Sequence, residues 1–289
     1  STGKIIDMGM AYEGSKAPRK AGVEALVLGD IHWGDHDPET IKANYEMISF
    51  FSPKRLFLHD FLNGHSVNPH EMKNTIMRAR EYKEGRLSIE RELQEGYKEL
   101  CNLANSMKGK KVYVVASNHP FFFKRYLEDG QYLKEPWNLE IALRYGAELA
   151  KKDSSIEGMG LRMIGKIPDN VNFLELTDDL KVEGWQLASH GHKGSSGARG
   201  SVVSREIGQG KSISGHTHAP EIMRDTIIVG TSTKNGLKKS PRITFCIVTV
   251  ILYTWLITGS QDGRMASSTD TIPNCCHNSI TASLDSLLT

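Results

Sequence analysis

Residues 23–32 read Val-Glu-Ala-Leu-Val-Leu-Gly-Asp-Ile-His, a short apolar run that is followed at once by two metal-binding side chains, Asp30 and His32. The same pattern recurs in four later segments: Arg55-Leu-Phe-Leu-His-Asp60, Lys111-Val-Tyr-Val-Val-Ala-Ser-Asn118-His119, Trp185-Gln-Leu-Ala-Ser-His190-Gly-His192 and Ser212-Ile-Ser-Gly-His216-Thr-His218. A sixth run, Thr226-Ile-Ile-Val-Gly, carries no such side chain and is expected to be a supporting strand.

Short runs that are rich in β-branched residues and bounded by Gly, Ser or Asn are typical of buried strands. Helical character is expected at 38–51, with Pro38 in the first turn, at 68–108 and at 137–150. Gly85 and Gly96 could interrupt the second helix, and 161–187 is expected to form strands with a turn at 177–179. The alternation predicts an α/β fold in which the strand ends form one rim and gather their polar side chains there.

The composition indicates a soluble globular protein of one large or two modest domains, with 289 residues, 24% of them charged and 39% hydrophobic. The net charge of +2 gives no global argument for nucleic-acid binding, although a local basic groove is compatible with it. Of the four Cys, only Cys101 lies in the first 240 residues, which argues against a disulfide framework and favours a reducing compartment. The chain has no secretory signal pattern and does not begin with Met, which indicates a processed protein or a fragment.

Three regions are expected along the chain: a flexible lead-in at 1–21, one domain at 22–234 and an atypical tail at 235–289. In the tail, 243–258 is almost purely apolar or Thr, and this run is shorter than the roughly 20 residues that cross a membrane. The tail is interpreted as edge strands with a disordered end, as foreign or frame-shifted sequence, or as a membrane anchor. The cluster Cys275-Cys276-His277 within it is interpreted as non-functional.

The order of the polar motifs resembles that of the calcineurin-like metallophosphoesterases, over residues 22–232. The motifs that carry this resemblance are Gly29-Asp30-Ile31-His32, Asp60 with Asn63-Gly64-His65, Ser117-Asn118-His119, His190-Gly191-His192 and Gly215-His216-Thr217-His218. The resemblance implies a four-layer α/β/β/α sandwich with mixed β-sheets, and two divalent metal ions that share Asp60. It assigns Asp30, His32, Asp60 and His218 to the first ion, and Asp60, Asn118, His190 and His216 to the second. It places His119 near the scissile phosphate, as a transition-state stabiliser or as a proton donor.

The chemistry of these side chains agrees with the resemblance. Two divalent ions about 3.5–4 Å apart neutralise a phosphodiester and lower the pKa of an attacking water. Mixed His, Asp and Asn ligands favour Mn²⁺, Fe or Zn²⁺ over Mg²⁺. A single His would more often be an ordinary core or surface residue, but His216 and His218 after a Gly, together with Asp30 and His32, favour a metal site. His192 is expected to support a ligand or face the substrate, while His36, His59, His65 and His70 are not expected to be ligands.

Three positions depart from the family pattern. His59 stands before Asp60 where Gly is usual, and Pro120 follows His119 where the family has an acid that holds the His, so the protonation state of His119 stays open. Asp60 is also not followed by Asp-Arg-Gly, which argues against a phosphoserine phosphatase.

Two segments favour DNA as the substrate. A Gly/Ser-rich basic loop between His190 and His216 carries Arg199 and Arg205, and the aromatic segment 121–126 carries Lys124 and Arg125. Cations hold phosphates and aromatic rings stack on bases, so these four residues and His192 are predicted to bind substrate. The alternatives are a solvated loop and a hydrophobic packing corner.

The chain is also similar to phage-encoded DNA-degrading metallophosphoesterases and more distantly to SbcD-type nucleases. We therefore expect a cytoplasmic Mn²⁺-dependent DNA nuclease, in the host cytoplasm if it is phage-encoded, that uses Asp60 and His119 as catalytic residues and a metal-bridging hydroxide as the nucleophile. The alternatives are a phosphodiesterase or phosphatase for small molecules and a non-catalytic scaffold subunit. No stable membrane partner is expected, and the long helix with 121–126 could form the interface of a homo-oligomer.

Overall fold

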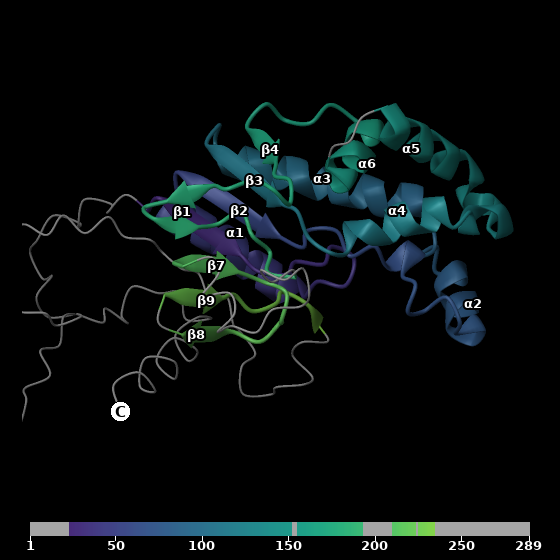
Figure 1. Ribbon diagram of the computed structural model, residues 1–289, viewed down its shortest axis with the longest axis horizontal. Coiled ribbons are helices and arrows are strands. Elements are labelled where there is room, and N and C mark those ends of the chain that lie inside the picture. The colour runs from purple at the N-terminus through teal and green to yellow at the C-terminus, as the bar shows by residue number, and fades with distance from the viewer. Residues whose placement is uncertain (1–22, 152–154, 193–209, 224, 235–289) are drawn as a thin grey trace, which may run out of the picture.

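The computed structural model describes residues 23–151, 155–192, 210–223 and 225–234 (Figure 1). The predicted lead-in, the tail with its Cys275-Cys276-His277 cluster, and Arg199 and Arg205 lie outside these residues, and the division into three regions stays a prediction. Within the described residues, no helix is long and apolar enough to cross a membrane.

The first sheet has four parallel strands in the order β1-β2-β3-β4. They are β1 Ala25–Leu28, β2 Arg55–His59, β3 Lys111–Val115 and β4 Val171–Phe173. Leu28 pairs with Leu58, and Leu58 pairs with Val114, so the carboxyl ends of the first three strands lie level. A parallel sheet that is covered on both faces needs near-continuous apolar strands, which is what the runs at 25–28 and 55–59 supply.

The second sheet is mixed, with the order β5-β6-β7-β9-β8. Its strands are β5 Lys181–Val182, β6 Trp185–Gln186, β7 Ser212–Ser214, β8 Glu221–Met223 and β9 Thr226–Ile228. Strand β7 pairs in parallel with both β6 and β9, whereas β5 with β6 and β8 with β9 are antiparallel pairs. The predicted supporting strand at 226–228 is confirmed as β9.

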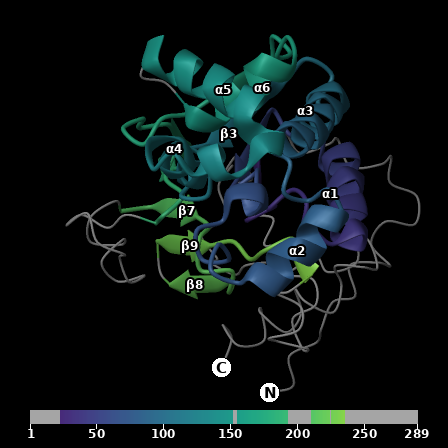
Figure 2. The same cartoon turned by 90° about the vertical axis from the view of Figure 1, so that its right-hand side faces the viewer.

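The helices lie on the other side of the first sheet and beyond one end of it. They are α1 Pro38–Phe51, α2 Thr75–Lys83, α3 Ile89–Ser106, α4 Pro120–Glu128, α5 Leu139–Lys151 and α6 Ile156–Ile164, with short 3₁₀ turns at His65–Val67, Gln131–Lys134 and Pro136–Asn138. The prediction for 38–51 is confirmed to the residue, because Asp37 caps the first turn and Pro38 follows it. Helix α2 has no buried residue and stands out from the rest (Figures 1 and 2).

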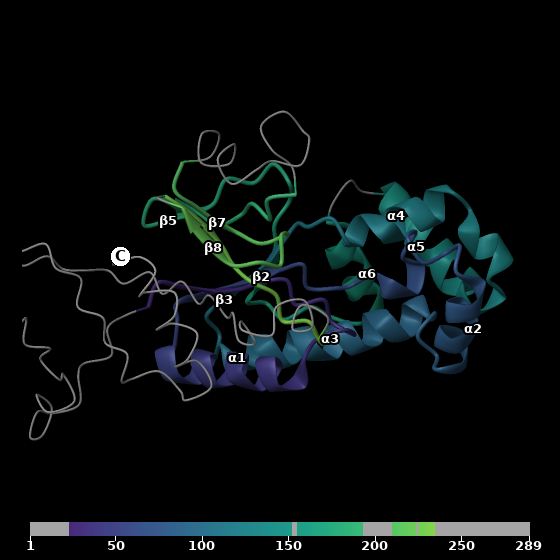
Figure 3. The same ribbon diagram turned by 90° about the horizontal axis from the view of Figure 1, so that it is seen from below.

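Two cores arise because side chains alternate across the first sheet. One face of the sheet presents residues such as Leu26, Leu56 and Val112 to α1, α3, α4, α5 and α6. The other face presents residues such as Val27 and Phe57 to the second sheet. The described residues thus form three layers, helix–sheet–sheet (Figure 3), of the four that were expected. The α/β class is confirmed, and of the two sheets that were expected to be mixed, the second is mixed and the first is parallel in the part of the chain that the structure describes.

Tertiary packing changed three of the local expectations. The helix at 68–108 is broken at Gly85, which adopts a φ of 70°, whereas Gly96 lies inside α3 and packs against Leu62. Residues 161–164 are the last turn of α6, not a strand, because Ser155 caps a helix that begins at Ile156. The expected turn lies slightly earlier, at 175–178, where the N–H of Asp178 donates to the carbonyl of Glu175 at 3.1 Å, and the strands on either side of it, β4 and β5, belong to different sheets.

Candidate metal centre

The ends of β1 and β2 place the two carboxylates side by side. The parallel pairing continues past both strands, because the N–H of His32 donates to the carbonyl of Asp60 at 2.9 Å and the N–H of Ile31 donates to the carbonyl of His59 at 3.1 Å. Asp30 and Asp60 are both fully buried at this rim. The order of apolar run and polar residue in the sequence therefore predicts this juxtaposition correctly.

Four imidazoles converge on these carboxylates. Nε2 of His218 lies 3.5 Å from Oδ2 of Asp30, and Nε2 of His190 lies 3.6 Å from Oδ2 of Asp60. Three overlapping groups have ligand atoms within 4.8 Å of one another: Asp30, His32 and His218; His32, Asp60 and His119; Asp30, Asp60 and His190. These residues come from five loops between residues 30 and 218, so the fold assembles a cluster able to bind a metal ion.

The two remaining predicted ligands lie beside the cluster. Nδ1 of His216 is 3.1 Å from Oδ1 of Asn118, and the backbone N–H of His216 donates to both carboxylate oxygens of Asp30 at 3.1 and 2.8 Å. The site is closed at its base, where the side chains of Asp30 and His190 are fully buried, and opens at His218, whose side chain is 41% exposed. Among the described residues, the cluster is therefore open on the His218 side.

The backbone around the cluster is strained. Positive φ values, which non-glycine residues seldom adopt, occur at Asp30 (21°), His32 (47°), Asp60 (44°), His216 (81°) and His218 (61°). Each such residue costs of order 1–3 kcal/mol, and strain of this kind collects at functional sites. The concentration of strain at the predicted ligands supports a function for this rim.

Burial disfavours the charged forms of the side chains in the cluster. It lowers the pKa of His32 to about 4 and the pKa of His190 well below its ordinary value, so both imidazoles are neutral, the form that binds metals. Burial and the neighbouring Asp60 raise the pKa of Asp30 well above its ordinary value. Burial also opposes ionisation of Asp60, but attraction to His32, His119 and His190 in their cationic forms outweighs it and holds the pKa of Asp60 below its ordinary value. A cation between the two carboxylates would let both ionise.

A second observation indicates that these residues suit a divalent cation. Nε2 of His190 is buried and has no hydrogen-bond partner among the described residues, yet it faces Asp60. An unpaired buried polar atom is costly, and coordination of a cation would satisfy it. Asp30, Asp60 and the imidazoles around them therefore make a suitable donor set.

A backbone carbonyl orients His119. The acid that holds this His in the family is absent from the sequence motif here. Its Nδ1 lies 2.8 Å from the carbonyl oxygen of Asn63, and since a carbonyl only accepts, Nδ1 carries the proton. The other nitrogen, Nε2, lies 3.8 Å from Oδ2 of Asp60. The tautomer left open by the sequence is thus set by Asn63.

A chain of polar contacts holds Asn63 in place. Its Nδ2 donates to Asp35 at 2.5 Å, and Asp35 in turn accepts from Arg86 at 2.6 Å. Arg86 also pairs with Glu81 at 2.5 Å. Sequence reasoning missed Asp35 and Arg86, and nothing in their local sequence marks them.

Two buried glutamates support the same loop. Glu157 of α6 accepts from the N–H of Leu62 at 2.8 Å, and Glu92 of α3 accepts from the N–H groups of Gly64 and Ser66 at 2.6 and 3.1 Å. Burial raises the pKa of Glu157 to about 8. These contacts fix the segment between Asp60 and Ser66 to α3 and α6.

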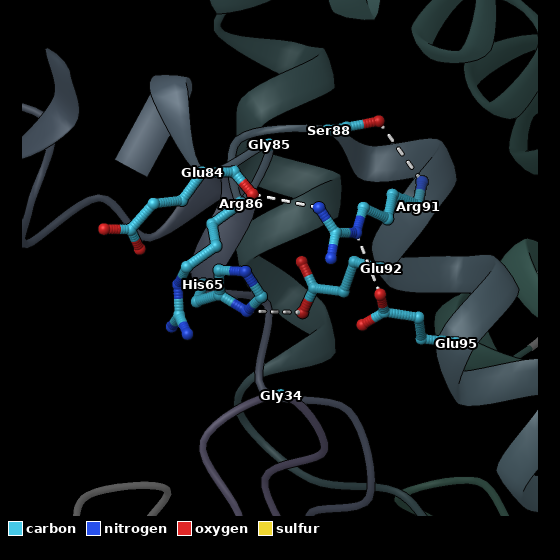
Figure 4. Close-up of a pocket in the computed structure, with 9 residues that line it drawn as sticks. All are labelled: Gly34, His65, Glu84, Gly85, Arg86, Ser88, Arg91, Glu92 and Glu95. Atoms are coloured by element: carbon cyan, nitrogen blue, oxygen red, sulfur yellow. Dashed lines mark hydrogen bonds and ion pairs between the residues drawn. The ribbon is translucent and has the colours of Figure 1, made fainter. Parts of the chain in front are cut away.

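A cavity of about 320 Å³ lies next to this loop, between Gly34, His65 and the start of α3 (Figure 4). Its charged side chains pair with one another: Arg91 bonds to Glu95 and to the carbonyl of Glu84, and His65 faces Glu92. Three glutamates in the lining oppose two arginines and His65, so the cavity has no surplus of positive charge for a phosphate.

Three further histidines have contacts within the described residues. The ring of His36 stacks on Trp33, and buried His59 lies with Nδ1 3.4 Å from Nδ1 of His190. The ring of His192 is 5.7 Å from that of His190 and 6.4 Å from that of Phe121, so it stands between the cluster and α4.

Comparison with known proteins finds a similarity to Protein A1 of Escherichia phage T5. The two are 29% identical over 215 residues, which cover 69% of this chain and 38% of the phage protein. The chain therefore spans well under half the length of that relative. No model of a protein family matches the chain, and no solved structure matches it.

Proposed function

We propose that this chain is a metal-dependent phosphodiesterase of the calcineurin-like metallophosphoesterase type and that it cleaves DNA. The observation that carries the proposal is the convergence of Asp30, Asp60 and their imidazoles on one strained, buried rim. DNA is favoured because α4, which follows His119 directly, exposes Lys124 and Arg125 beside aromatic rings.

Two divalent ions would be held by the ligand sets that the family resemblance assigns, with Asp60 shared between them. When bound, such ions neutralise the phosphate and lower the pKa of the attacking water. Nitrogen and oxygen donors in one set favour Mn²⁺, Fe or Zn²⁺ over Mg²⁺. Mn²⁺ is our first choice.

The chain's own contribution is positioning and proton transfer. Asn63 keeps the proton of His119 on Nδ1, so a second proton on Nε2 would be available for the oxygen that leaves phosphorus. Water adds to phosphorus in line with that oxygen and releases one proton to solvent, the phosphorus–oxygen bond breaks, and the departing oxygen takes the proton from Nε2 of His119. No covalent bond to the protein is required.

The test is turnover by the full chain supplied with Mn²⁺, on plasmid DNA and on bis-p-nitrophenyl phosphate, with Asp60→Asn as the inactive variant. We expect release of acid-soluble nucleotide by the parent and loss of both activities in Asp60→Asn, with weaker Mn²⁺ uptake by calorimetry. Hydrolysis of the small ester alone would end the nuclease proposal. No turnover, with Mn²⁺ uptake unchanged in Asp60→Asn, would favour a non-catalytic scaffold.

A further inference from the structure

A hollow of about 470 Å³ lies on α4 beside the metal centre. It is lined by Pro69, His70, Phe121, Phe122, Lys124, Arg125 and Glu128. Aromatic rings meet two cations here, which is the combination that binds nucleotides: the ring faces stack on a base while the cations hold its phosphate. Its volume lies within the range of sites for small ligands, about 300–1,000 Å³.

The two cations are available to a ligand. Lys124 and Arg125 are 48% and 67% exposed, and they form ion pairs with Glu128 and Asp129, one turn further along the chain, at 3.8 and 3.4 Å. Exposed pairs of this kind are weak and exchange readily for a phosphate.

The hollow and the metal centre share a wall. The ring of Phe122 stacks on His119 with 4.9 Å between centroids and 30° between planes, and His70 packs edge-on against Phe122 at 5.9 Å. On the other side, Phe121 lies 6.4 Å from His192. A group seated in the hollow therefore lies next to the position where His119 would meet the leaving oxygen.

We propose that this hollow binds the base of the nucleotide that adjoins the scissile phosphate, and that the substrate is unpaired at that nucleotide. The inference rests on the proposed phosphodiesterase activity. A base stacked inside a duplex cannot present its face to Phe121 and Phe122, so the hollow favours a single strand or a frayed end over an intact duplex. The ligand of the hollow is a nucleobase with an attached phosphate, which either an oligonucleotide or a free nucleotide could supply.

The variant that tests the proposal is Phe121→Ala, compared with Phe50→Ala, which truncates an exposed Phe on α1 away from the hollow. Affinity for a fluorescent single-stranded oligonucleotide is measured by anisotropy, and KM by cleavage. We expect Phe121→Ala to weaken both by about tenfold to a hundredfold, since stacking on an aromatic ring is worth about 1–3 kcal/mol per base. Phe121→Trp should restore binding, and Phe50→Ala should bind like the parent.

Two further binding measurements distinguish the possible ligands. A blunt duplex of the same sequence should bind more weakly than the single strand, and competition by a free mononucleotide shows whether one nucleotide suffices. Bis-p-nitrophenyl phosphate, which has no base, reports the reaction itself: its KM should change several-fold less in Phe121→Ala.

Normal ester hydrolysis combined with equal oligonucleotide affinity in Phe121→Ala and Phe50→Ala would overturn the base site alone. No hydrolysis of any ester by the parent would overturn the proposed function and the inference with it. If Phe121→Ala melts early, Phe121→Leu keeps the apolar volume without the ring and should show the same loss of affinity.

Discussion

Substituting Ala for Gly215 should disable the metal centre without changing a single ligand. Gly215 precedes His216, and its N–H donates to the carbonyl of His190 at 3.1 Å. A Cβ at this position would lie 3.1 Å from Cε1 of His190 and 3.2 Å from Cγ of Asp30, and still closer to Oδ1 of Asp30. Carbon atoms normally pack about 3.5–4.0 Å apart.

The expected loss of activity follows from the tight packing around Asp30. It is fully buried and tied by two hydrogen bonds to His216, so relieving the clash must move the carboxylate or the imidazole by about half an ångström or more. Catalytic groups tolerate about 0.5 Å, and a misplacement of about 1 Å costs about a hundredfold. We expect kcat/KM for bis-p-nitrophenyl phosphate to fall about a hundredfold, with weaker Mn²⁺ uptake and about 1–3 kcal/mol less stability from overpacking.

The assay is calorimetric Mn²⁺ titration, ester turnover and chemical denaturation on the same preparations. Gly146→Ala is the matched control: Gly146 lies inside α5, and a Cβ there meets no atom within 4 Å. It should keep full activity and gain up to about 1 kcal/mol from helix propensity. If Gly215→Ala keeps turnover within about threefold of the parent, the exact placement of Asp30 and His190 does not matter for the reaction, and the reasoning is refuted.

Three further substitutions probe the surroundings of the cluster. His119→Ala should keep Mn²⁺ uptake but lose about 10²–10⁴-fold in turnover, because its proposed role is proton transfer. Arg86→Gln should loosen Asp35 and hence Asn63, with Mn²⁺ uptake kept and turnover lowered about 10- to 100-fold. Glu157→Gln should flatten the dependence of stability on pH. Burial raises the pKa of Glu157 from 4.5 to about 8, so its contribution to folding is full below about pH 4.5 and is lost as pH rises to about 8.

Each of these has an outcome that contradicts it. If His119→Ala loses Mn²⁺ uptake and turnover equally, His119 is a metal ligand and not a proton donor. For Arg86→Gln, an unchanged pH–rate profile with parental kcat would show that Arg86 does not position His119. For Glu157→Gln, urea unfolding at pH 5 and pH 8.5 is compared with the parent, and an equal fall in both proteins would exclude Glu157 as the titrating group.

Local sequence determined the strands and the residues that follow them. Each apolar run is long enough for one buried strand, and the residue after it must emerge at the carboxyl edge of the sheet. Asp30 and Asp60 therefore came together as predicted, whereas His190 follows β6 of the second sheet and reaches them only because the two sheets pack against each other. The helix at 38–51 was equally predictable, because Asp37 and Pro38 act within its first turn.

Only tertiary structure decided how these groups are held. Glu157 reaches Leu62 across 95 residues of sequence, and Arg86 reaches Asp35 across 51, so no local pattern records either contact. Packing likewise assigned β4 and β5 to different sheets, and it set the tautomer of His119 through Asn63. The physical reason is that strand and helix signals arise within a few residues, whereas the burial and hydrogen bonding that orient a reactive group depend on distant segments meeting in the fold.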